Sequence, residues 1–394
     1  MRRLLFIIFA LVLVCHHVMA QDMWDDLATS DYRIDTTDVK ALRVEVDNLS
    51  FFHNNEYGGK LSKGYSLPGL WIQPKLTYSP IKQIALEVGL HALIFNGANK
   101  YPCYAYHDIG TWKGNQYQSG AHLLPWIRAK AQFKYLTVVL GNIFGGQNHQ
   151  LIEPLFNPEL NLSQDPEMGA QLLWDRPNLH ADIWLNWQSY IFKMDTHQEA
   201  FTVGMNWMVY YNKPGSTVNW FSPIQLVVQH RGGEQNIENK GVQTLSNVSL
   251  GVGMKWNANR SALKQLGAEL NMLAAYQQSG QLWPFKTGFA VHTGLHFNLW
   301  DHLGLKASYL YAPKHFISLY GNPLFNTVSQ VDQTDYKGNN TLSARVSYHY
   351  VIDKHYVLGA QAEVFRTWLP DNKETSFNFG IYLRVNPSIL IKKW

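Results

Sequence analysis

Residues 375–386 read TSFNFGIYLRVN, and the spacing of their apolar side chains decides the fold class of this chain. Alternate residues fall into two sets. The mainly apolar set comprises Thr375, Phe377, Phe379, Ile381, Leu383 and Val385, and the other comprises Ser376, Asn378, Gly380, Tyr382, Arg384 and Asn386. A period of two predicts a β-strand with one face in an apolar medium and the other in water. Such a strand fits either a soluble sandwich or a transmembrane barrel with an aqueous interior.

The rest of the chain repeats this alternation from Leu42 onward and indicates about sixteen strands. Most of the alternating segments are long enough to cross a bilayer at the usual tilt, which takes ~9–11 residues. Strands of a soluble sandwich are typically about 5–6 residues long. The length of the segments therefore favours a membrane barrel. Residues 135–143 are apolar on both faces, so the register of that segment stays open.

The connections between the predicted strands mostly alternate between long and short. Tight turns on one rim and longer loops on the other are typical of an up-and-down barrel with both chain ends in the periplasm. A Greek-key sandwich has no reason to keep this parity, so we predict one barrel domain over residues 41–394. The long connections are expected at 53–65, 96–120, 145–166, 192–199, 231–243, 277–283 and 312–339, and the tight ones at 79–83, near Lys134, and at 175–178, 212–215, 257–261, 301–302 and 353–354, with 369–374 closing the series.

The first twenty residues are typical of a secretory signal peptide. Arg2 and Arg3 form a positive n-region, and residues 4–14 form an apolar segment that is short for a transmembrane helix. We expect cleavage directly after Ala20. Cys15 raises the alternative of a lipoprotein, but the residue before it is not the small residue that lipidation favours.

The composition of the remaining chain narrows the class further. Only Cys103 remains after cleavage, which excludes an intramolecular disulfide. The chain has 14 Trp and 21 Tyr at a mean hydropathy of −0.22, which suits alternating strands with aromatic girdles. The net charge of +4 is mild and gives no indication of a nucleic-acid partner. Residues 21–40 are acidic without a clear period and are interpreted as a solvated periplasmic segment.

On this pattern, the chain resembles the porin-like outer-membrane β-barrels of Gram-negative bacteria over residues 42–385. The segments that are similar to uncharacterised barrels of the Bacteroidetes type are 141–146 (GNIFGG), 182–187 (DIWLNW) and 229–233 (QHRGG). Such barrels usually end in an aromatic residue that the barrel-assembly machinery reads, and Trp394 fits that habit. Residues 389–393 depart from the alternating terminal signal, so the way in which the C-terminus closes the barrel stays open.

Charged side chains on the predicted inner face are the first candidates for function. Clustered Lys and Arg would attract anions, because rings of charge set the selectivity of a pore. The alternative is that opposite charges pair across the wall and satisfy one another. The candidate pore-lining residues are Lys75, Arg128, Lys130, Lys255, Lys286, Lys306, Arg345, Arg384, Asp182, Glu269 and Glu363.

The loop 145–166 is the second candidate, because it carries the acids Glu153, Glu159 and Asp165. The resemblance implies that a long loop at this place folds inward and narrows the pore. Its acids would then face a basic wall and create a transverse field that orients polar solutes. An ordinary external loop is an equally good interpretation of this segment.

Aromatic and histidine side chains on the inner face were weighed for binding and catalysis. Stacked rings can guide sugars, although Trp and Tyr more often fill space near the interfaces. His292 and His296 are ~13 Å apart at ~3.3 Å per residue, too far for one zinc. Ser347 and His349 lack a visible orienting group and point inward, whereas outer-membrane lipases work from lipid-facing residues near a rim. The inward aromatics are Trp71, Trp126, Trp184 and Tyr382.

These observations predict an all-β, up-and-down outer-membrane barrel that passes small hydrophilic solutes, with anions preferred. The first alternative is a plugged, non-conducting barrel that acts as a surface binding or assembly protein. The second is an outer-membrane hydrolase, which requires a Ser/His/acid set near a rim. We expect no cofactor, metal or catalytic residue. The expected partners are outer-membrane lipid and lipopolysaccharide, a small solute and the barrel-assembly machinery, and a homo-oligomer is left open.

Overall fold

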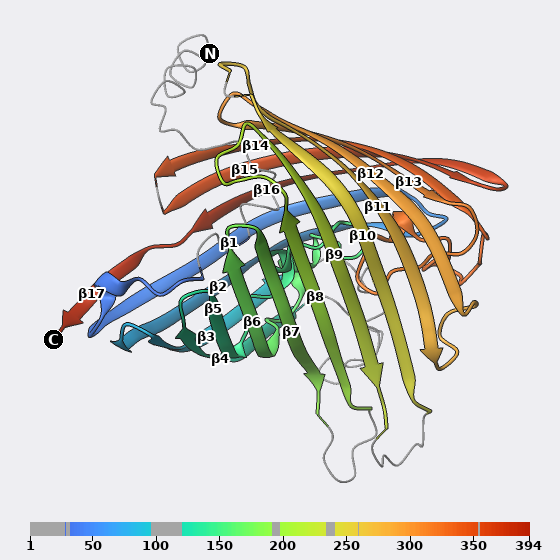
Figure 1. Cartoon of the computed structure of the whole chain (residues 1–394). Helices are drawn as coiled ribbons and strands as arrows, with labels where there is room; N and C mark the ends of the chain where they lie inside the picture. Colours follow the sequence, from blue (N-terminus) through green and yellow to red (C-terminus); the bar gives the residue numbers. More distant parts are fainter. Residues whose placement is uncertain are drawn as a thin grey trace, which may run out of the picture.

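The computed structural model describes residues 28, 32–95, 120–190, 198–233, 241–258, 260–353 and 355–394 (Figure 1). The predicted signal peptide, its cleavage after Ala20, Cys103 and residues 96–119 lie outside the described residues. No helix among the described residues is long and apolar enough to cross a membrane.

Seventeen strands of the described chain form one antiparallel sheet. The sheet closes on itself, which confirms the predicted all-β barrel. The strands are β1 (Ala41–Gly58), β2 (Lys63–Ile81), β3 (Ile84–Phe95), β4 (Gly120–Gln132), β5 (Leu136–Asn142), β6 (Met168–Arg176), β7 (Leu179–Ser189), β8 (Ala200–Tyr210), β9 (Val218–Arg231), β10 (Gln243–Asn257), β11 (Leu263–Ser279), β12 (Thr287–Leu299), β13 (Leu303–Ala312), β14 (Asn339–Asp353), β15 (Tyr356–Leu369), β16 (Asn372–Val385) and β17 (Ser388–Lys393). Short helical turns are η2 (Thr36–Asp38), η5 (Gly146–His149), α3 (Leu160–Ser163) and η6 (Pro323–Phe325).

The first strand closes the barrel, because β1 pairs with β2 on one side and with both β16 and β17 on the other. Pro387 interrupts the last strand, and β17 then continues along the first half of β1. The Val46 amide donates to the Pro387 carbonyl at 3.0 Å and bridges the interruption. β16 and β17 together therefore form the sixteenth strand of the closed barrel. The terminal residues that break the alternating pattern belong to β17, which Figure 1 shows at the C-terminus.

Burial along β16 follows the predicted two-residue period. Phe377 and Ile381 are 48% and 55% exposed on the outer face, whereas Asn378 and Tyr382 are 5% and 2% exposed on the inner face. The register left open in β5 is also settled, because Leu140 is exposed and Val139 is buried. The outer face is thus apolar and the inner face is largely polar, as the lipid and the lumen require.

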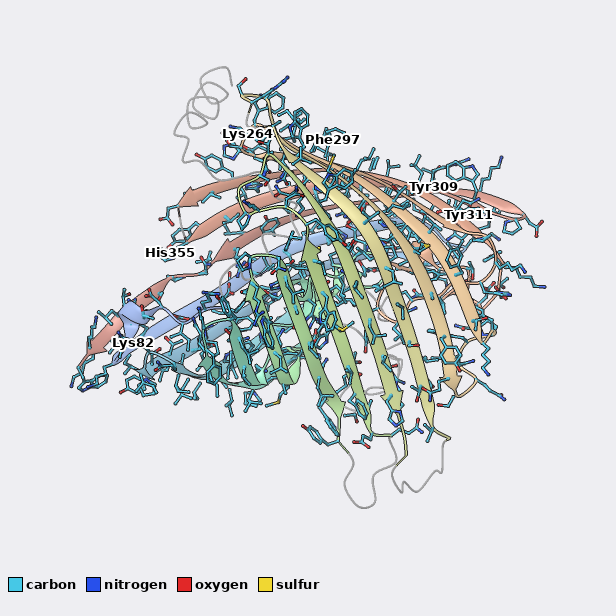
Figure 2. All side chains as sticks on the ribbon, in the orientation of Figure 1. Lys82, Lys264, Phe297, Tyr309, Tyr311 and His355 are labelled. Carbon is cyan, nitrogen blue, oxygen red and sulfur yellow. The ribbon has the colours of Figure 1, made fainter. Side chains whose placement is uncertain are left out.

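The two rims of the barrel differ. The rim that carries the start of β1 and the end of β17 also carries the short turns, marked in Figure 2 by Lys82, Lys264 and His355. The opposite rim carries the longer loops. The predicted long connection 53–65 is wrong, because β1 and β2 run on to leave only residues 59–62 between them. The polar residues at the end of β1 hide the strand pattern in the sequence, but they pair with β2 and β16.

Two loops fold into the barrel instead of outward. The plug loop (residues 143–167) joins β5 to β6, and the second lumenal loop (residues 313–338) joins β13 to β14. They meet at a bridge between Phe156 and Tyr320. Buried side chains of both loops form one apolar cluster with wall residues, including Leu151, Leu155, Phe156, Leu160, Phe316, Ile317, Leu319, Leu324, Phe325, Trp184, Val227, Leu273 and Phe365. The two loops and the wall therefore share one apolar core inside the barrel.

Two residues of the chain before β1 contact inward side chains of the barrel. The Tyr32 ring lies 6.1 Å from that of Phe144, and its hydroxyl donates to Asp175 on β6. Ile34 is 6% exposed. Tyr32 and Ile34 therefore contact the barrel, whereas Arg33 and residues 35–37 are exposed to solvent, as the sequence predicts for this acidic segment.

Candidate functional site

The first acid of the plug loop is neutralised by the wall. Glu153 accepts from Lys306 at 2.9 Å and from Arg345 at 2.6 Å, and Arg345 also donates to Glu363 at 2.8 Å. Burial alone would raise the pKa of Glu153, but attraction to Arg345 and Lys306 outweighs burial and holds it well below its usual range. Four of the predicted site residues therefore form one ion network that anchors the loop.

The second acid, Glu159, is fixed to the first two strands. Its carboxylate accepts from Asn55 at 2.6 Å and Tyr65 at 2.5 Å, and it lies 3.1 Å from Nε2 of His53. Burial raises the pKa of Glu159, but the hydrogen bonds, that of His53 foremost, lower it further than burial raises it. Gly380 makes room for this network, since a Cβ there would lie 2.6 Å from Nδ1 of His53.

The remaining plug acid and the wall cations of β2 and β4 also find partners. Asp165 lies 3.0 Å from Nδ1 of His122. On the neighbouring strand β3, one carboxylate, Glu87, gathers three of the predicted pore-lining cations. Its distances are 3.3 Å to Lys75, 3.5 Å to Arg128 and 3.3 Å to Lys130.

The other predicted pore-lining residues are not brought together. Arg384 pairs with Asp47 at 3.0 Å. The Lys255 ammonium lies 5.6 Å from an aromatic ring, Glu269 is half-buried on β11, and Lys286 is exposed in the connection before β12. Most of the wall charges therefore satisfy one another, which is the alternative that the sequence left open for them.

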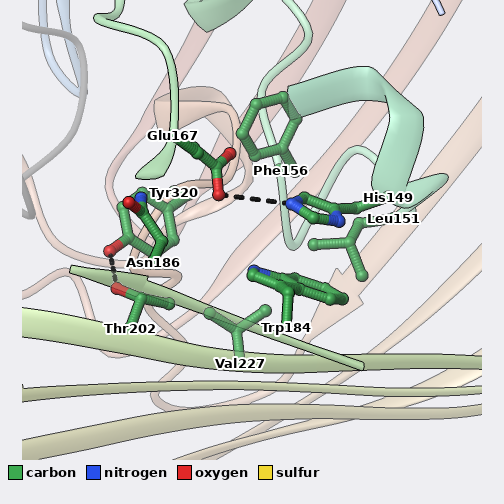
Figure 3. Close-up of a pocket in the computed structure, with 9 residues that line it drawn as sticks. All are labelled: His149, Leu151, Phe156, Glu167, Trp184, Asn186, Thr202, Val227 and Tyr320. Atoms are coloured by element: carbon green, nitrogen blue, oxygen red, sulfur yellow. Dashed lines mark hydrogen bonds and ion pairs between the residues drawn. The ribbon is translucent and has the colours of Figure 1, made fainter. Parts of the chain in front are cut away.

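A small pocket between the plug loop and the wall holds the most buried histidine of the loop (Figure 3). Nδ1 of His149 lies 2.7 Å from Asp182, Nε2 lies 3.2 Å from Glu167, and the ring stacks on Trp184 at 3.6 Å. Burial lowers the pKa of His149, but Glu167 and Asp182 together raise it to about 9. The other lining residues are Leu151, Phe156, Asn186, Thr202, Val227 and Tyr320.

This pocket fastens the plug loop to the wall of the barrel and is not a reaction site. Its volume of about 20 Å³ holds about one water molecule. Both ring nitrogens of His149 face carboxylates, so the imidazolium has no lone pair with which to accept a proton. The Tyr320 hydroxyl bonds to Thr202 in the same pocket and ties the second lumenal loop to β8.

The four inward aromatics support the wall and the plug. Trp126 donates Nε1 to Glu87 at 3.2 Å, and the Trp71 ring lies 5.8 Å from that of His91. The Trp184 ring stacks on the His149 ring. Tyr382 is 2% exposed and packs against Gly359.

The inward histidines and serine that the sequence offered for catalysis are spread over the wall. His292 is buried edge-on to the Phe325 ring at 5.9 Å. His349 is fully buried, and the Ser347 hydroxyl donates to the Gly304 carbonyl at 3.5 Å. Within the described ranges, no group of three or more His, Cys, Asp or Glu side chains is placed to hold a metal ion.

The outer face of β1 and β2 carries polar groups where lipid-facing strands are otherwise apolar. Asn54 pairs with Ser66 on β2 and with Phe379 on β16, so all three share the lipid-facing side. The Ser66 hydroxyl donates to Oδ1 of Asn54, and Nδ2 of Asn54 donates to Oε1 of Glu56 at 2.9 Å. We call Asn54, Glu56 and Ser66 the outer patch.

The outer patch lies near the rim of the long loops. Glu56 pairs with Phe377 on β16. On the outer face of β16, Phe377 is the apolar residue nearest to this rim, and the next outward residue toward the rim is Thr375. Polar side chains among lipid are expensive and mark function or contact with a partner. Here a carboxylate is held by an amide that a hydroxyl orients, an arrangement that suits a general base.

Sequence reasoning missed the outer patch because residues 53–65 were assigned to a loop. The run 53–56, His-Asn-Asn-Glu, has no apolar member, so the period of two is invisible there. The signal that could have found it is the preceding alternation from Leu49 to Phe52, which continues without a glycine or proline into this run.

The fold and the apolar outer face define the class, which is an outer-membrane β-barrel. The chain belongs to the Lipid A 3'-O-deacylase-type family, whose model matches residues 34–394. The family is named for a hydrolase, the second of the alternatives that the sequence left open beside a porin-like channel. No curated protein matches the sequence.

Several solved barrels are similar in structure at low identity. OprD from Pseudomonas aeruginosa is 9% identical with a TM-score of 0.49, covering 91% of this chain and 98% of that one. A loop L8 deletion mutant of OmpT from Vibrio cholerae is 9% identical with a TM-score of 0.49, covering 88% and 100%. OccAB3 from Acinetobacter baumannii is 12% identical with a TM-score of 0.47, covering 88% and 99%.

Proposed function

We propose that this barrel is an outer-membrane hydrolase that removes an ester-linked acyl chain from lipid A. The observation that carries the proposal is the outer patch, because it offers hydrolytic groups to lipid and not to the lumen. The family description points to the same chemistry. Outer-membrane lipid and lipopolysaccharide are then substrate as well as surroundings, and the barrel-assembly machinery stays an expected partner.

The reaction follows from the groups of the outer patch. Glu56 accepts a proton from a water molecule, and the water oxygen attacks the ester carbonyl carbon. Asn54 holds the carboxylate at 2.9 Å, while the Ser66 hydroxyl fixes the orientation of the Asn54 amide. The carbon–oxygen bond to the sugar then breaks, and Glu56 returns the proton to the leaving sugar oxygen. The products are a fatty acid and a free sugar hydroxyl.

The packing of the two lumenal loops against the wall supports this proposal over free diffusion. Both lumenal loops are buried among wall side chains, and the plug loop carries three acids that are each paired. A barrel that works on its outer face does not require an open interior, and a packed interior holds the wall strands rigid.

The test is the mass of lipid A from a Gram-negative host that makes fully acylated lipid A and expresses this chain. Wild-type protein should remove one acyl chain. Glu56→Gln should reduce the rate of acyl-chain removal by roughly 10²–10⁴-fold, which is the usual contribution of a general base. Glu45→Gln, on the lumenal face of the same strand, is the matched control and should keep activity. Unchanged lipid A beside folded, heat-modifiable wild-type barrel would refute the proposal.

A channel for small hydrophilic solutes is the second candidate. The observation that favours it is the cluster of Lys75, Arg128 and Lys130 around one acid, because a surplus of cations on the lumenal wall attracts anions. Steady single-channel steps with anion preference in a planar bilayer would support this function, and a silent folded barrel would refute it.

A further inference from the structure

Two cations lie on the lipid-facing side beside the outer patch, at the height of the membrane surface. Arg366 on β15 pairs with Thr375 on β16, and the next pair toward the rim is Trp368 with Lys373. Each pair alternates with buried residues such as Phe365, so these four side chains face outward. Trp and Lys are the residues that anchor barrels at the interface, which places this rung near the lipid headgroups.

The charge of Arg366 is not met by an acid of the wall. Its Nη1 donates to the Thr375 hydroxyl at 2.6 Å. In the part of the chain that the structure describes, no carboxylate lies within ion-pair distance of Arg366, although Asp371 lies in the turn that follows β15 and Glu56 lies two strands away. A lipid-facing guanidinium needs a counter-charge, and phosphate is the anion that its fork binds best.

The strand register orders these groups along the membrane normal. From the rim inward the outer-facing rungs are Trp368–Lys373, then Arg366–Thr375, then Phe377–Glu56, then Phe379–Asn54–Ser66. Arg366 and Glu56 are two strands and two residues apart, or ~12 Å between Cα atoms at ~4.8 Å per strand and ~3.3 Å per residue. The extended side chain of Arg366 spans about half of that distance. The remaining gap between its guanidinium and Glu56 is about the width of a sugar ring.

We propose that Arg366, with Lys373 as its neighbour, forms an anion subsite for a phosphate on the sugar that carries the scissile ester. This inference rests on the proposed function and adds the side chains that recognise the phosphate of its substrate. The order of the rungs matches such a lipid in the outer leaflet: the phosphate binds at Arg366, the ester reaches Glu56, and the acyl chains lie along Phe377 and Phe379.

The experiment is a cycle of two variants and two substrates with full-length protein in detergent micelles. Binding is measured on Glu56→Gln protein, so that no product forms, with bisphosphorylated and with dephosphorylated lipid A as ligands. Arg366→Gln in this background should raise the Kd for the bisphosphorylated lipid about tenfold and leave the Kd for the dephosphorylated lipid unchanged. Lys264→Gln, near the opposite rim, is the matched control and should change neither.

Each outcome decides the proposal. An equal loss for both lipids, or no loss for either, would overturn the anion subsite. Competition by phosphatidylglycerol as strong as that by bisphosphorylated lipid A would show a general contact with anionic lipid and would also overturn it. Because binding is read without turnover, a barrel that binds by phosphate but releases no fatty acid would refute only the proposed function.

Discussion

The carboxylate of Glu159 on the plug loop lies 3.1 Å from Nε2 of His53 on β1. His53 and Asn55 face the lumen, and they alternate with Asn54 and Glu56 on the lipid-facing side of the same strand. The plug loop therefore holds from inside the short stretch of wall that carries the outer patch. A rigid support of this kind keeps reacting groups in a productive geometry.

Glu159→Gln should lower the rate of hydrolysis about tenfold while the barrel stays folded, because an amide cannot accept all three of the hydrogen bonds that the carboxylate accepts. The measurement is kcat and KM of the purified variant on lipid A. Because Glu159 acts through the wall, kcat should fall more than KM rises. Glu153→Gln is the matched control, a plug acid tied to distant strands, and an equal fall in both variants would show a purely structural role.

Arg345→Ala should reduce the free energy of unfolding by about 3–5 kcal/mol, because it leaves Glu363 buried without its cation. Arg384→Ala removes a more exposed pair with Asp47 and should cost about 0–1 kcal/mol. Urea titration of both variants in lipid vesicles measures the difference. Equal losses would contradict the assignment of the Arg345 network as the main anchor of the plug loop.

The stability of the barrel should fall with rising pH through the titration of His149, which lies on the plug loop outside the strands. Its pKa is about 9 in the folded protein against 6.5 for the free side chain. The stabilisation is therefore fully present below pH 6.5 and is lost as the pH rises through 9, by at most about 3–4 kcal/mol at ~1.4 kcal/mol per pKa unit. Urea titrations between pH 6 and pH 10 measure it, and His149→Gln should remove the slope over this window.

Deletion of residues 148–161 should turn a silent barrel into a conducting one. The deletion removes Leu151, Leu155 and Phe156 from the lumenal cluster together with two of the three anchoring acids. Single-channel recording in a planar bilayer is the measurement, with heat-modifiable mobility as the check of folding. Conductance equal to that of the wild type would mean that the plug loop does not obstruct the lumen.

The barrel itself could be predicted from the sequence because lipid on one side and polar groups on the other impose a period of two. Residues 375–386 follow this period without exception, and the structure confirms both faces of that strand. The loop acids Glu153, Glu159 and Asp165 are visible in the sequence, and in the structure each lies beside a basic side chain of the wall.

The site could not be predicted, because its residues break the rule that reveals the barrel. Asn54 and Glu56 are polar on the lipid-facing side, so periodicity assigned them to a loop. The partners of His149 and the route of β17 past Pro387 depend on register between distant segments, which one sequence does not contain. Positions where the local pattern and the fold disagree are expected to be functional or strained.

The central claim is that the outer face of this barrel hydrolyses an ester of lipid A. The most direct measurement is incubation of purified, folded protein with lipid A in vesicles made in ¹⁸O-labelled water, followed by mass spectrometry. The account predicts a released fatty acid that carries one ¹⁸O atom and a lipid A lighter by that acyl chain, with neither formed by Glu56→Gln. Intact lipid A and no labelled fatty acid in the presence of folded wild-type protein would contradict the account.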